Sequence, residues 1–198
     1  KGTGHHNPRC LTAGVVSHSA PPRQASCNRR ETALRRFRET LPATAHRSAV
    51  LDQLKRSDVV IVSGDTGSGK TTQVPQFLLD DTSLSGLILC TQPRRISAMS
   101  VAQRVAKERG EALGDSTGYT IRFESVTCAR TRLVYVTTGI LLRVMHSNPT
   151  LEGIGAVIVD EVHERDLDTD FALLLLRDLL RGKRKGTLKL LIMSATIN

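Results

Sequence analysis

Short apolar runs alternate with longer segments of helical periodicity along most of the chain. The short runs are rich in Val, Ile and Leu and are bounded by Gly, Ser or charged residues, which is typical of β-strands. Six runs fit this description, at residues 59–63, 87–90, 119–123, 133–136, 156–159 and 188–193. Most of them are apolar without interruption, and for 59–63 in particular we predict a parallel strand buried on both faces.

The segments between these runs carry apolar residues at helical spacing. We predict helices at residues 35–40, 47–55, 71–79, 96–108, 140–146 and 171–180, with Leu41-Pro42 separating the first two. Asp166 or Asp168 suits the N-cap or the first turn of the last helix. Strands that alternate with helices imply right-handed crossovers. We therefore predict one α/β domain over residues 34–198, in which helices cover both faces of a parallel sheet.

Positive charge is concentrated near the N-terminus. The 198 residues carry a net charge of +9, and residues 1–50 hold nine Lys and Arg against two Asp and Glu. This balance favours a polyanionic partner. Because residues 1–33 are basic and lack sustained apolar periodicity, we expect them to form a disordered extension. Their acid-poor composition also describes a mitochondrial transit peptide. We expect the nucleus or the cytoplasm as the compartment, with the mitochondrion as the alternative.

Composition excludes several classes of protein. No apolar run approaches the 18 residues that a membrane-spanning helix requires, so we expect no membrane partner. The four cysteines lack the paired spacing of a zinc site or a disulfide framework. Two Tyr, four Phe and no Trp leave little aromatic surface for base stacking, so contacts with a nucleic acid should be made mainly to its backbone.

A glycine-rich segment lies between the strand predicted at 59–63 and the helix predicted at 71–79. Its residues are Gly64, Asp65, Thr66, Gly67, Ser68, Gly69, Lys70, Thr71 and Thr72. In a strand–loop–helix context the pattern G-x-x-x-x-G-K-[ST] is typical of a phosphate-binding loop. We expect Lys70 to contact the β- and γ-phosphates of a nucleotide and the Thr71 hydroxyl to bind Mg²⁺. The flanking elements disfavour the alternative, a glycine-rich turn that matches by chance.

Asp160 and Glu161 directly follow the strand predicted at 156–159. Ligands bind beyond the carboxyl ends of parallel strands, so we expect this pair to approach Lys70 and, with Thr71, to form the metal site. Asp160 would bind Mg²⁺ through water, and Glu161 would orient or deprotonate the attacking water. A solvated acidic turn is the alternative, because four more acids follow within the next ten residues. The phosphate loop favours the metal site.

The ordered motifs of the chain resemble those of the DEAH/RHA-type superfamily 2 RNA helicases. The resemblance covers about residues 34–198 and is closest to the RNA helicase A-like branch. The motifs are the Gly64–Gln73 loop, Thr91-Gln92-Pro93-Arg94-Arg95, Thr137-Thr138-Gly139, Asp160-Glu161-Val162-His163-Glu164-Arg165 and Ser194-Ala195-Thr196. Val162 stands where the family's namesake motif has Ala, and Asp65 stands where Glu is common. Both changes leave the implied chemistry intact.

The resemblance implies a RecA-like fold with ATP and Mg²⁺ as cofactors. It implies hydrolysis by Lys70 and Glu161 and coupling of the nucleotide state to a second RecA-like domain through His163, Ser194 and Thr196. Arg104 would stack on the nucleotide base, and its alternative is an ordinary exposed helix arginine. The family positions that hold single-stranded RNA are Arg94, Arg95, Thr137, Thr138 and Gly139. For Arg94 and Arg95 the alternative is a solvated helix start.

These implications lead us to expect the first motor domain of an ATP-dependent RNA helicase that remodels RNA or ribonucleoprotein. The second RecA-like domain would lie outside this chain. Because an arginine from that domain supplies much of the transition-state stabilisation in related NTPases, we expect the isolated chain to be nearly inactive and unable to unwind a duplex. The alternatives are a non-catalytic RNA- or ribonucleoprotein-binding scaffold with a helicase fold and another P-loop ATPase, such as a transporter or a DNA-repair motor.

Overall fold

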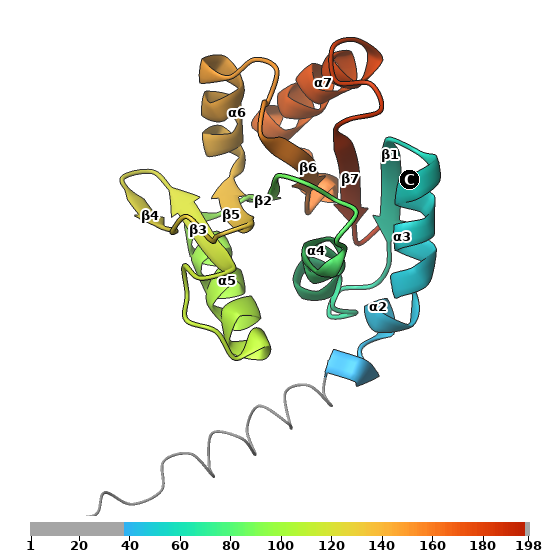
Figure 1. The fold of residues 1–198 in the computed structure, drawn as a ribbon, viewed down its shortest axis with the longest axis vertical. Coiled ribbons are helices and arrows are strands. Elements are labelled where there is room, and N and C mark those ends of the chain that lie inside the picture. The colour runs from blue at the N-terminus through green and yellow to red at the C-terminus, as the bar shows by residue number, and fades with distance from the viewer. Residues whose placement is uncertain (1–37, 197–198) are drawn as a thin grey trace, which may run out of the picture.

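The computed structural model of the protein describes residues 38–196, in which a seven-stranded sheet forms the centre (Figure 1). The strands follow the order β1-β7-β6-β2-β5-β3-β4, and β4 alone runs antiparallel to its neighbour within this range. Their bounds are β1 Val59–Ser63, β2 Leu87–Gln92, β3 Thr117–Ile121, β4 Glu124–Val126, β5 Leu133–Thr137, β6 Ile154–Val159 and β7 Lys189–Ser194. The predicted parallel α/β sheet is confirmed.

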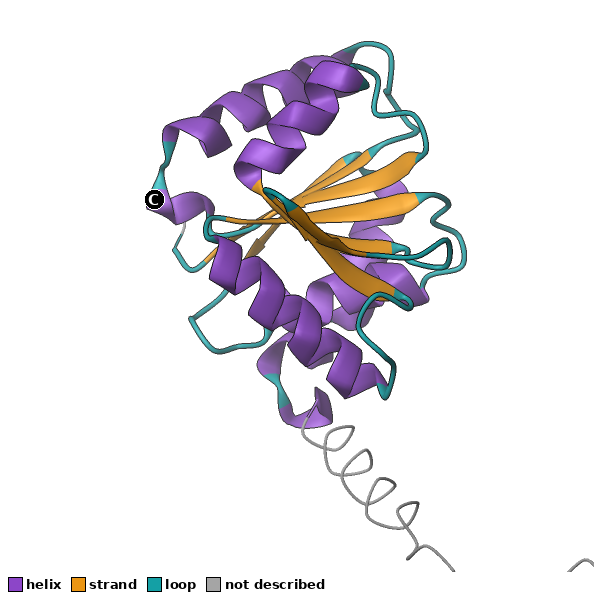
Figure 2. Ribbon diagram, turned by 90° about the vertical axis from the view of Figure 1, so that its left-hand side faces the viewer, coloured by secondary structure: helices purple, strands orange, loops and turns teal. Residues whose placement is uncertain are grey.

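Helices cover both faces of the sheet, so that the domain has three layers (Figure 2). The helices α3, α4 and α5 pack on one face, and α6 and α7 pack on the other. Their bounds are α2 Pro42–Ala45, α3 Arg47–Arg56, α4 Lys70–Asp80, α5 Arg95–Arg109, α6 Thr138–Ser147 and α7 Leu167–Arg181, with a short 3₁₀ turn η1 at Val162–Glu164. Across residues 38–196, no helix is long and apolar enough to span a membrane.

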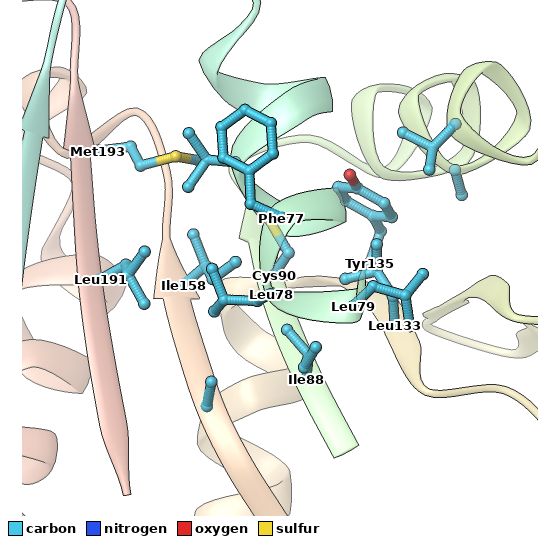
Figure 3. Close-up of a cluster of buried hydrophobic side chains, with 14 of the residues drawn as sticks. Phe77, Leu78, Leu79, Ile88, Cys90, Leu133, Tyr135, Ile158, Leu191 and Met193 are labelled. Carbon is cyan, nitrogen blue, oxygen red and sulfur yellow. The ribbon is translucent and has the colours of Figure 1, made fainter. Parts of the chain in front are cut away.

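Alternation along the central strands divides the core into two clusters. On β6, Ile158 points into the cluster beneath α4 and α5, whereas Val157 points into the cluster beneath α6 and α7. Figure 3 shows the first cluster, in which Phe77 of α4 lies above Cys90 and Ile158. Burying a branched or aromatic side chain contributes about 1.5–3 kcal/mol. The uninterrupted apolar runs therefore reflect two buried faces, as the sequence predicted.

The strand β1 departs from its prediction, because it lies at one of the two edges of the sheet within residues 38–196. Val60 packs against the core, but Val59 and Ile61 are 43% and 60% exposed. An apolar run predicts a strand that is covered on two faces. The position of the strand in the sheet depends on how the strands pair in the folded protein, which the run itself does not encode.

Other differences lie at element ends. The strand predicted at 119–123 ends at Ile121, and a two-residue turn through Arg122 and Phe123 leads into β4 as a hairpin. Phe123 has φ 69° and is 90% exposed, so it cannot continue the strand. Near the N-terminus, residues 38–40 are helical and a separate short helix, α2, begins at Pro42, where we predicted only a break.

The helix α7 begins at Leu167 instead of residue 171. Asp166 is its N-cap, because the Asp166 carboxylate accepts a hydrogen bond of 2.9 Å from the backbone N–H of Thr169. Asp168 lies in the first turn, where its negative charge interacts favourably with the positive end of the helix dipole. Asp166 therefore takes the predicted N-cap position, and Asp168 takes the predicted first-turn position. The basic extension predicted at residues 1–33 lies outside the described residues.

Asp58, before β1, joins the edge strand to the start of β7. Its carboxylate lies 2.9 Å from Lys189 Nζ and accepts a 2.8 Å hydrogen bond from the backbone N–H of Gly186. The hydrogen bond from Lys189, followed by that from Gly186, lowers the pKa of Asp58. Because the pKa is lowered on folding, the ionised carboxylate stabilises the fold at pH values above 3.8, its ordinary pKa. This stabilisation is lost as the pH falls through the lowered pKa of the folded state.

We expect Asp58→Asn to lower the free energy of unfolding at pH 7 by about 1 kcal/mol, because the pair is partly exposed. Urea denaturation at pH 7 and pH 3 measures the change. The difference between variant and wild type should shrink at pH 3, and a difference that grows on acidification would contradict the assignment. Asp52→Asn, which removes an exposed pair with Lys55 on α3, is the control.

Candidate functional site

The glycine-rich loop connects β1 to α4 at the carboxyl edge of the sheet. Gly67 and Gly69 have φ values of 83° and 92°, in the left-handed region that favours glycine. Gly69 is the N-cap of α4, so the loop turns directly into the positive end of the helix dipole. The backbone thus has the conformation that a phosphate-binding loop needs.

Lys70, the first residue of α4, is 9% exposed, and its side chain folds back over the loop. Its ammonium donates to the carbonyl of Gly64, to the carbonyl of Asp65 at 2.8 Å and to the hydroxyl of Ser68 at 3.3 Å. A buried charge requires such partners. The ammonium therefore lies within the loop, where the phosphates of a nucleotide would offer stronger acceptors than carbonyl groups.

Asp160 follows β6 and is 4% exposed. One carboxylate oxygen accepts a 2.7 Å hydrogen bond from Gln92 Nε2 at the end of β2, and the other accepts the backbone N–H of Glu161 at 2.9 Å. Burial raises the pKa of Asp160, while the neighbouring side chains of Thr71 and Gln92 oppose this rise. Folding brings the loop and the acid together, as the sequence predicted.

Thr71 and Asp160, with Glu161 beside them, offer the oxygen donors of the predicted magnesium site. Mg²⁺ prefers oxygen ligands, and it takes only one or two carboxylates from a protein when waters and substrate phosphates complete its shell. Within residues 38–196, no group of three or more His, Cys, Asp or Glu residues could hold a metal ion alone. The residues therefore fit a metal that binds together with a nucleotide, and they do not form a site for a metal alone.

Glu161 is half-buried beside Asp160 and has φ 55°, a left-handed conformation that is uncommon for a residue with a side chain. Burial, followed by the charge of Asp160, raises the pKa of Glu161, while His163 and Lys70 act in the opposite direction. A raised pKa makes a carboxylate a better proton acceptor near neutral pH. Glu161 therefore has the environment of a general base.

His163 connects Glu161 to the end of β7. Its Nδ1 lies 3.4 Å from Glu161 Oε2 and accepts a 3.4 Å hydrogen bond from the backbone N–H of Ala195. The neighbouring Ser194 is 3% exposed, and its carbonyl accepts a 3.3 Å hydrogen bond from the backbone N–H of Gly64. Ser194 Oγ bonds to the backbone of Thr196, which is exposed. These contacts link the acidic motif, the end of β7 and the glycine-rich loop.

A cavity of about 330 Å³ is lined by part of the glycine-rich loop, by the start of α4 and by Glu161, whereas Asp160, Gln92 and His163 are not among its lining residues. Its lining comprises Leu41, Thr66, Gly67, Gly69, Lys70, Thr71, Thr72, Arg104, Glu108, Glu161 and Ala195. A larger cavity, of about 640 Å³, is lined by residues of α3 and β1 and by the loop, and Thr66, Gly67 and Lys70 line both cavities. The smaller cavity is the candidate nucleotide site, because Thr71 and Glu161 line it and neither lines the larger one. Arg104, predicted at the base, lies in the same cavity.

A basic surface lies at the carboxyl edge beside this cavity. Arg94 and Arg95 follow β2, and Thr137 ends β5 at the register position opposite Gln92, so the two motifs are neighbours. Both arginines are exposed, and a side chain added at Gly139 would meet no atom within 4 Å. Thr138 differs, because its side chain is buried and its hydroxyl lies 3.4 Å from that of Thr169. Any contact from Thr138 to a ligand would come from its backbone.

Two residues that support the site were not predicted from the sequence. Gln92 holds Asp160, and the buried Tyr135 on β5 donates a 3.0 Å hydrogen bond to the carbonyl of Thr71. Both contacts join positions more than 60 residues apart. Gln92 could have been predicted, because it lies inside the motif Thr91-Gln92-Pro93-Arg94-Arg95. Tyr135 could not, because its sequence position resembles that of any other residue in an apolar strand.

Comparison with known proteins agrees with this geometry. The model of the DEAD/DEAH box helicase family matches residues 44–198. The DExH-box ATP-dependent RNA helicase DExH1 of Arabidopsis thaliana is 51% identical over 171 residues, which cover 84% of this chain and 17% of that protein. The human putative ATP-dependent RNA helicase DHX57 is 50% identical over 182 residues, which cover 89% of this chain and 13% of that protein.

Among solved structures, that of the Escherichia coli DEAH/RHA helicase HrpB has a TM-score of 0.77 and is 43% identical, covering 80% of this chain and 20% of that one. The chain therefore spans a fifth or less of the length of each of these relatives.

Proposed function

This chain belongs to the DEAD/DEAH box helicase family, and from that premise we propose that it is the first, ATP-binding motor domain of an ATP-dependent RNA helicase. The observation that carries the proposal is the convergence of Lys70 and Thr71, at the start of α4, with Asp160 and Glu161, which directly follow β6. Relatives named as ATP-dependent RNA helicases support the activity and the substrates. We propose hydrolysis of ATP coupled to movement on single-stranded RNA and to remodelling of RNA or ribonucleoprotein.

In the proposed reaction, the backbone N–H groups of the loop and the Lys70 ammonium bind the β- and γ-phosphates. Thr71 and Asp160 would hold Mg²⁺, which neutralises charge on the phosphate oxygens when it is bound. Glu161 would orient a water molecule for in-line attack and accept its proton, for which its raised pKa is suited. Gln92 keeps the Asp160 carboxylate oriented.

His163, Ser194 and Thr196 would couple the nucleotide to a second RecA-like domain. His163 contacts both Glu161 and Ala195, so a change at the γ-phosphate can reach the end of β7. We propose that this second domain belongs to the same polypeptide, because the relatives are several times longer than the chain. It would supply the arginine that stabilises the transition state. The isolated chain should then hydrolyse ATP very slowly.

Titration of the chain with ATP by isothermal calorimetry, with and without Mg²⁺, tests the proposal. We expect weak binding that strengthens when Mg²⁺ is present, because Thr71 and Asp160 provide only part of a metal shell. Absence of binding at millimolar ATP would refute the nucleotide site. Binding to the chain with no turnover in a two-domain form would favour the alternative function, a scaffold that retains the helicase fold.

For RNA, we propose that Arg94, Arg95, Thr137, Thr138 and Gly139 contact the phosphate backbone. Two exposed arginines beside the open backbone at Gly139 suit a phosphodiester chain, whose phosphates they can bind whatever the base sequence. Arg94 also lies 4.0 Å from Glu164, which is a weak surface pair that a phosphate can displace.

We expect the double variant Arg94→Ala, Arg95→Ala to bind single-stranded RNA more weakly whatever its sequence. The negative slope of log affinity against log salt should become shallower by about 1.4, which is 0.7 for each lost phosphate contact. Fluorescence anisotropy with labelled oligonucleotides at several salt concentrations measures both effects. Arg177→Ala with Arg181→Ala removes the same charge from exposed positions on α7 and should leave the slope unchanged. Equal losses in the two double variants would contradict the assignment.

A further inference from the structure

Glu108, on α5, carries a buried carboxylate that the proposed reaction does not use. Its side chain is 1% exposed. One oxygen accepts a 2.6 Å hydrogen bond from Arg104 Nε, and the other accepts hydrogen bonds of 2.9 Å from Gln73 Nε2 and 3.0 Å from Gln76 Nε2. Arg38 Nε lies 3.9 Å from the second oxygen. Burying a charged carboxylate costs free energy unless it is paired and hydrogen-bonded. These four partners therefore hold the Glu108 carboxylate in one defined position.

This network reaches the glycine-rich loop. Gln73 Nε2 also lies 2.9 Å from Thr72 Oγ1, and the Thr72 hydroxyl donates to the carbonyl of Gly69 at 3.3 Å. A continuous set of hydrogen bonds therefore runs from Gly69 through Thr72 and Gln73 to Glu108 and on to Arg104. Both ends of this set line the cavity of 330 Å³.

Arg104 is the arginine that faces the cavity. Its side chain is 45% exposed, and the cavity that it lines also contains Leu41, which lies against Gly69. A guanidinium group stacks on aromatic rings through its planar face, but an exposed arginine must lose side-chain entropy to do so. Glu108 holds Arg104 Nε in place before a ligand arrives, which reduces this cost.

We propose that Glu108 is a positioning residue, which orients the Arg104 guanidinium toward the nucleotide base and ties it to the phosphate loop through Gln73. This inference rests on the proposed function, since it assumes that the cavity takes a nucleotide. Through Glu108 and Arg104, the nucleotide base would contribute to the affinity for ATP in addition to the phosphates.

Calorimetric titrations of the chain with Mg²⁺-ATP and with Mg²⁺-tripolyphosphate, which has no base, test the proposal. We expect Glu108→Gln to weaken ATP binding by about three- to tenfold, the size of a partly exposed cation–π contact, and to leave tripolyphosphate binding within about twofold. Arg104→Ala should have the same pattern. The double variant should be no weaker than Arg104→Ala alone, because Glu108 acts through Arg104.

An equal loss for both ligands would mean that Glu108 only supports the loop, and an unchanged ATP affinity would mean that it does nothing for the base. Either result overturns the positioning role while leaving the nucleotide site intact. If the wild-type chain binds neither ligand, the proposed function itself fails. Glu111→Gln, which removes an acid paired with Arg109 outside this cavity, is the matched control and should bind both ligands as wild type does.

Arg104→Lys provides a second variant in case Glu108→Gln does not fold. Lysine keeps the positive charge but lacks the planar group and the Nε anchor. It should therefore lower ATP affinity while tripolyphosphate affinity stays the same. A wild-type ratio of the two affinities in Arg104→Lys would overturn the proposal.

Discussion

Replacing Glu161 by Gln in a protein that joins this domain to a second RecA-like domain should lower RNA-stimulated ATP hydrolysis by about 10²–10⁴-fold, the usual contribution of a general base. An amide cannot accept the proton of the attacking water, yet it keeps the shape of the side chain. Nucleotide affinity should stay the same or increase, because burial and Asp160 disfavour the charge of Glu161 in the wild type. Steady-state hydrolysis and fluorescent-nucleotide binding measure the two quantities separately.

A loss of ATP hydrolysis without a loss of nucleotide affinity would identify Glu161 as the general base. A loss of binding equal to the loss of hydrolysis would mean that Glu161 serves the metal site or the fold instead of the attacking water. Glu152→Gln is the control, since Glu152 is exposed and lies before β6, at the end of that strand away from Asp160. Its hydrolysis rate should remain within about twofold of wild type, as surface substitutions usually have small effects.

Replacing Lys70 by Ala should weaken Mg²⁺-ATP binding by about ten- to a hundredfold, because hydrogen bonds to charged groups contribute about 1.5–3 kcal/mol. The Lys70 ammonium lies among the carbonyl groups of the loop, where phosphates would bind. Calorimetry on the isolated chain measures the affinity, and no second domain is needed.

The fold of Lys70→Ala needs a check, because the ammonium also bridges Gly64, Asp65 and Ser68. Thermal denaturation shows whether the loop contacts stabilise the native state. Lys55→Ala, on the exposed face of α3, is the matched control and should bind ATP as wild type does. Undiminished affinity in a folded Lys70→Ala variant would contradict the assignment of the loop.

The backbone of the glycine-rich loop and the place of the acidic pair could be predicted because their sequence patterns are local. The spacing from Gly64 to Thr71 requires a particular backbone, and the apolar run before Asp160 places that acid at the carboxyl edge of a parallel sheet. The same reasoning predicted the central strands, since burial on two faces requires uninterrupted apolar residues.

Other features depend on contacts that no local pattern records. The turn at Arg122 and Phe123 lacks the Gly or Asn that usually signals a hairpin, so the strand before it was predicted too long. The exposed edge of β1 depends on the order of the strands. Glu108 lies among charged residues of α5 and looks solvent-exposed in sequence, yet its partners on α4 bury it.

We propose that this domain is one of the two halves of an ATP-driven motor that responds to RNA. The most direct test of this proposal is the rate of ATP hydrolysis by the two-domain protein in the absence and in the presence of single-stranded RNA. We expect RNA to stimulate hydrolysis, and we expect the stimulated rate to require both Lys70 and Glu161. A rate that RNA does not change, or that survives both Lys70→Ala and Glu161→Gln, would contradict the account.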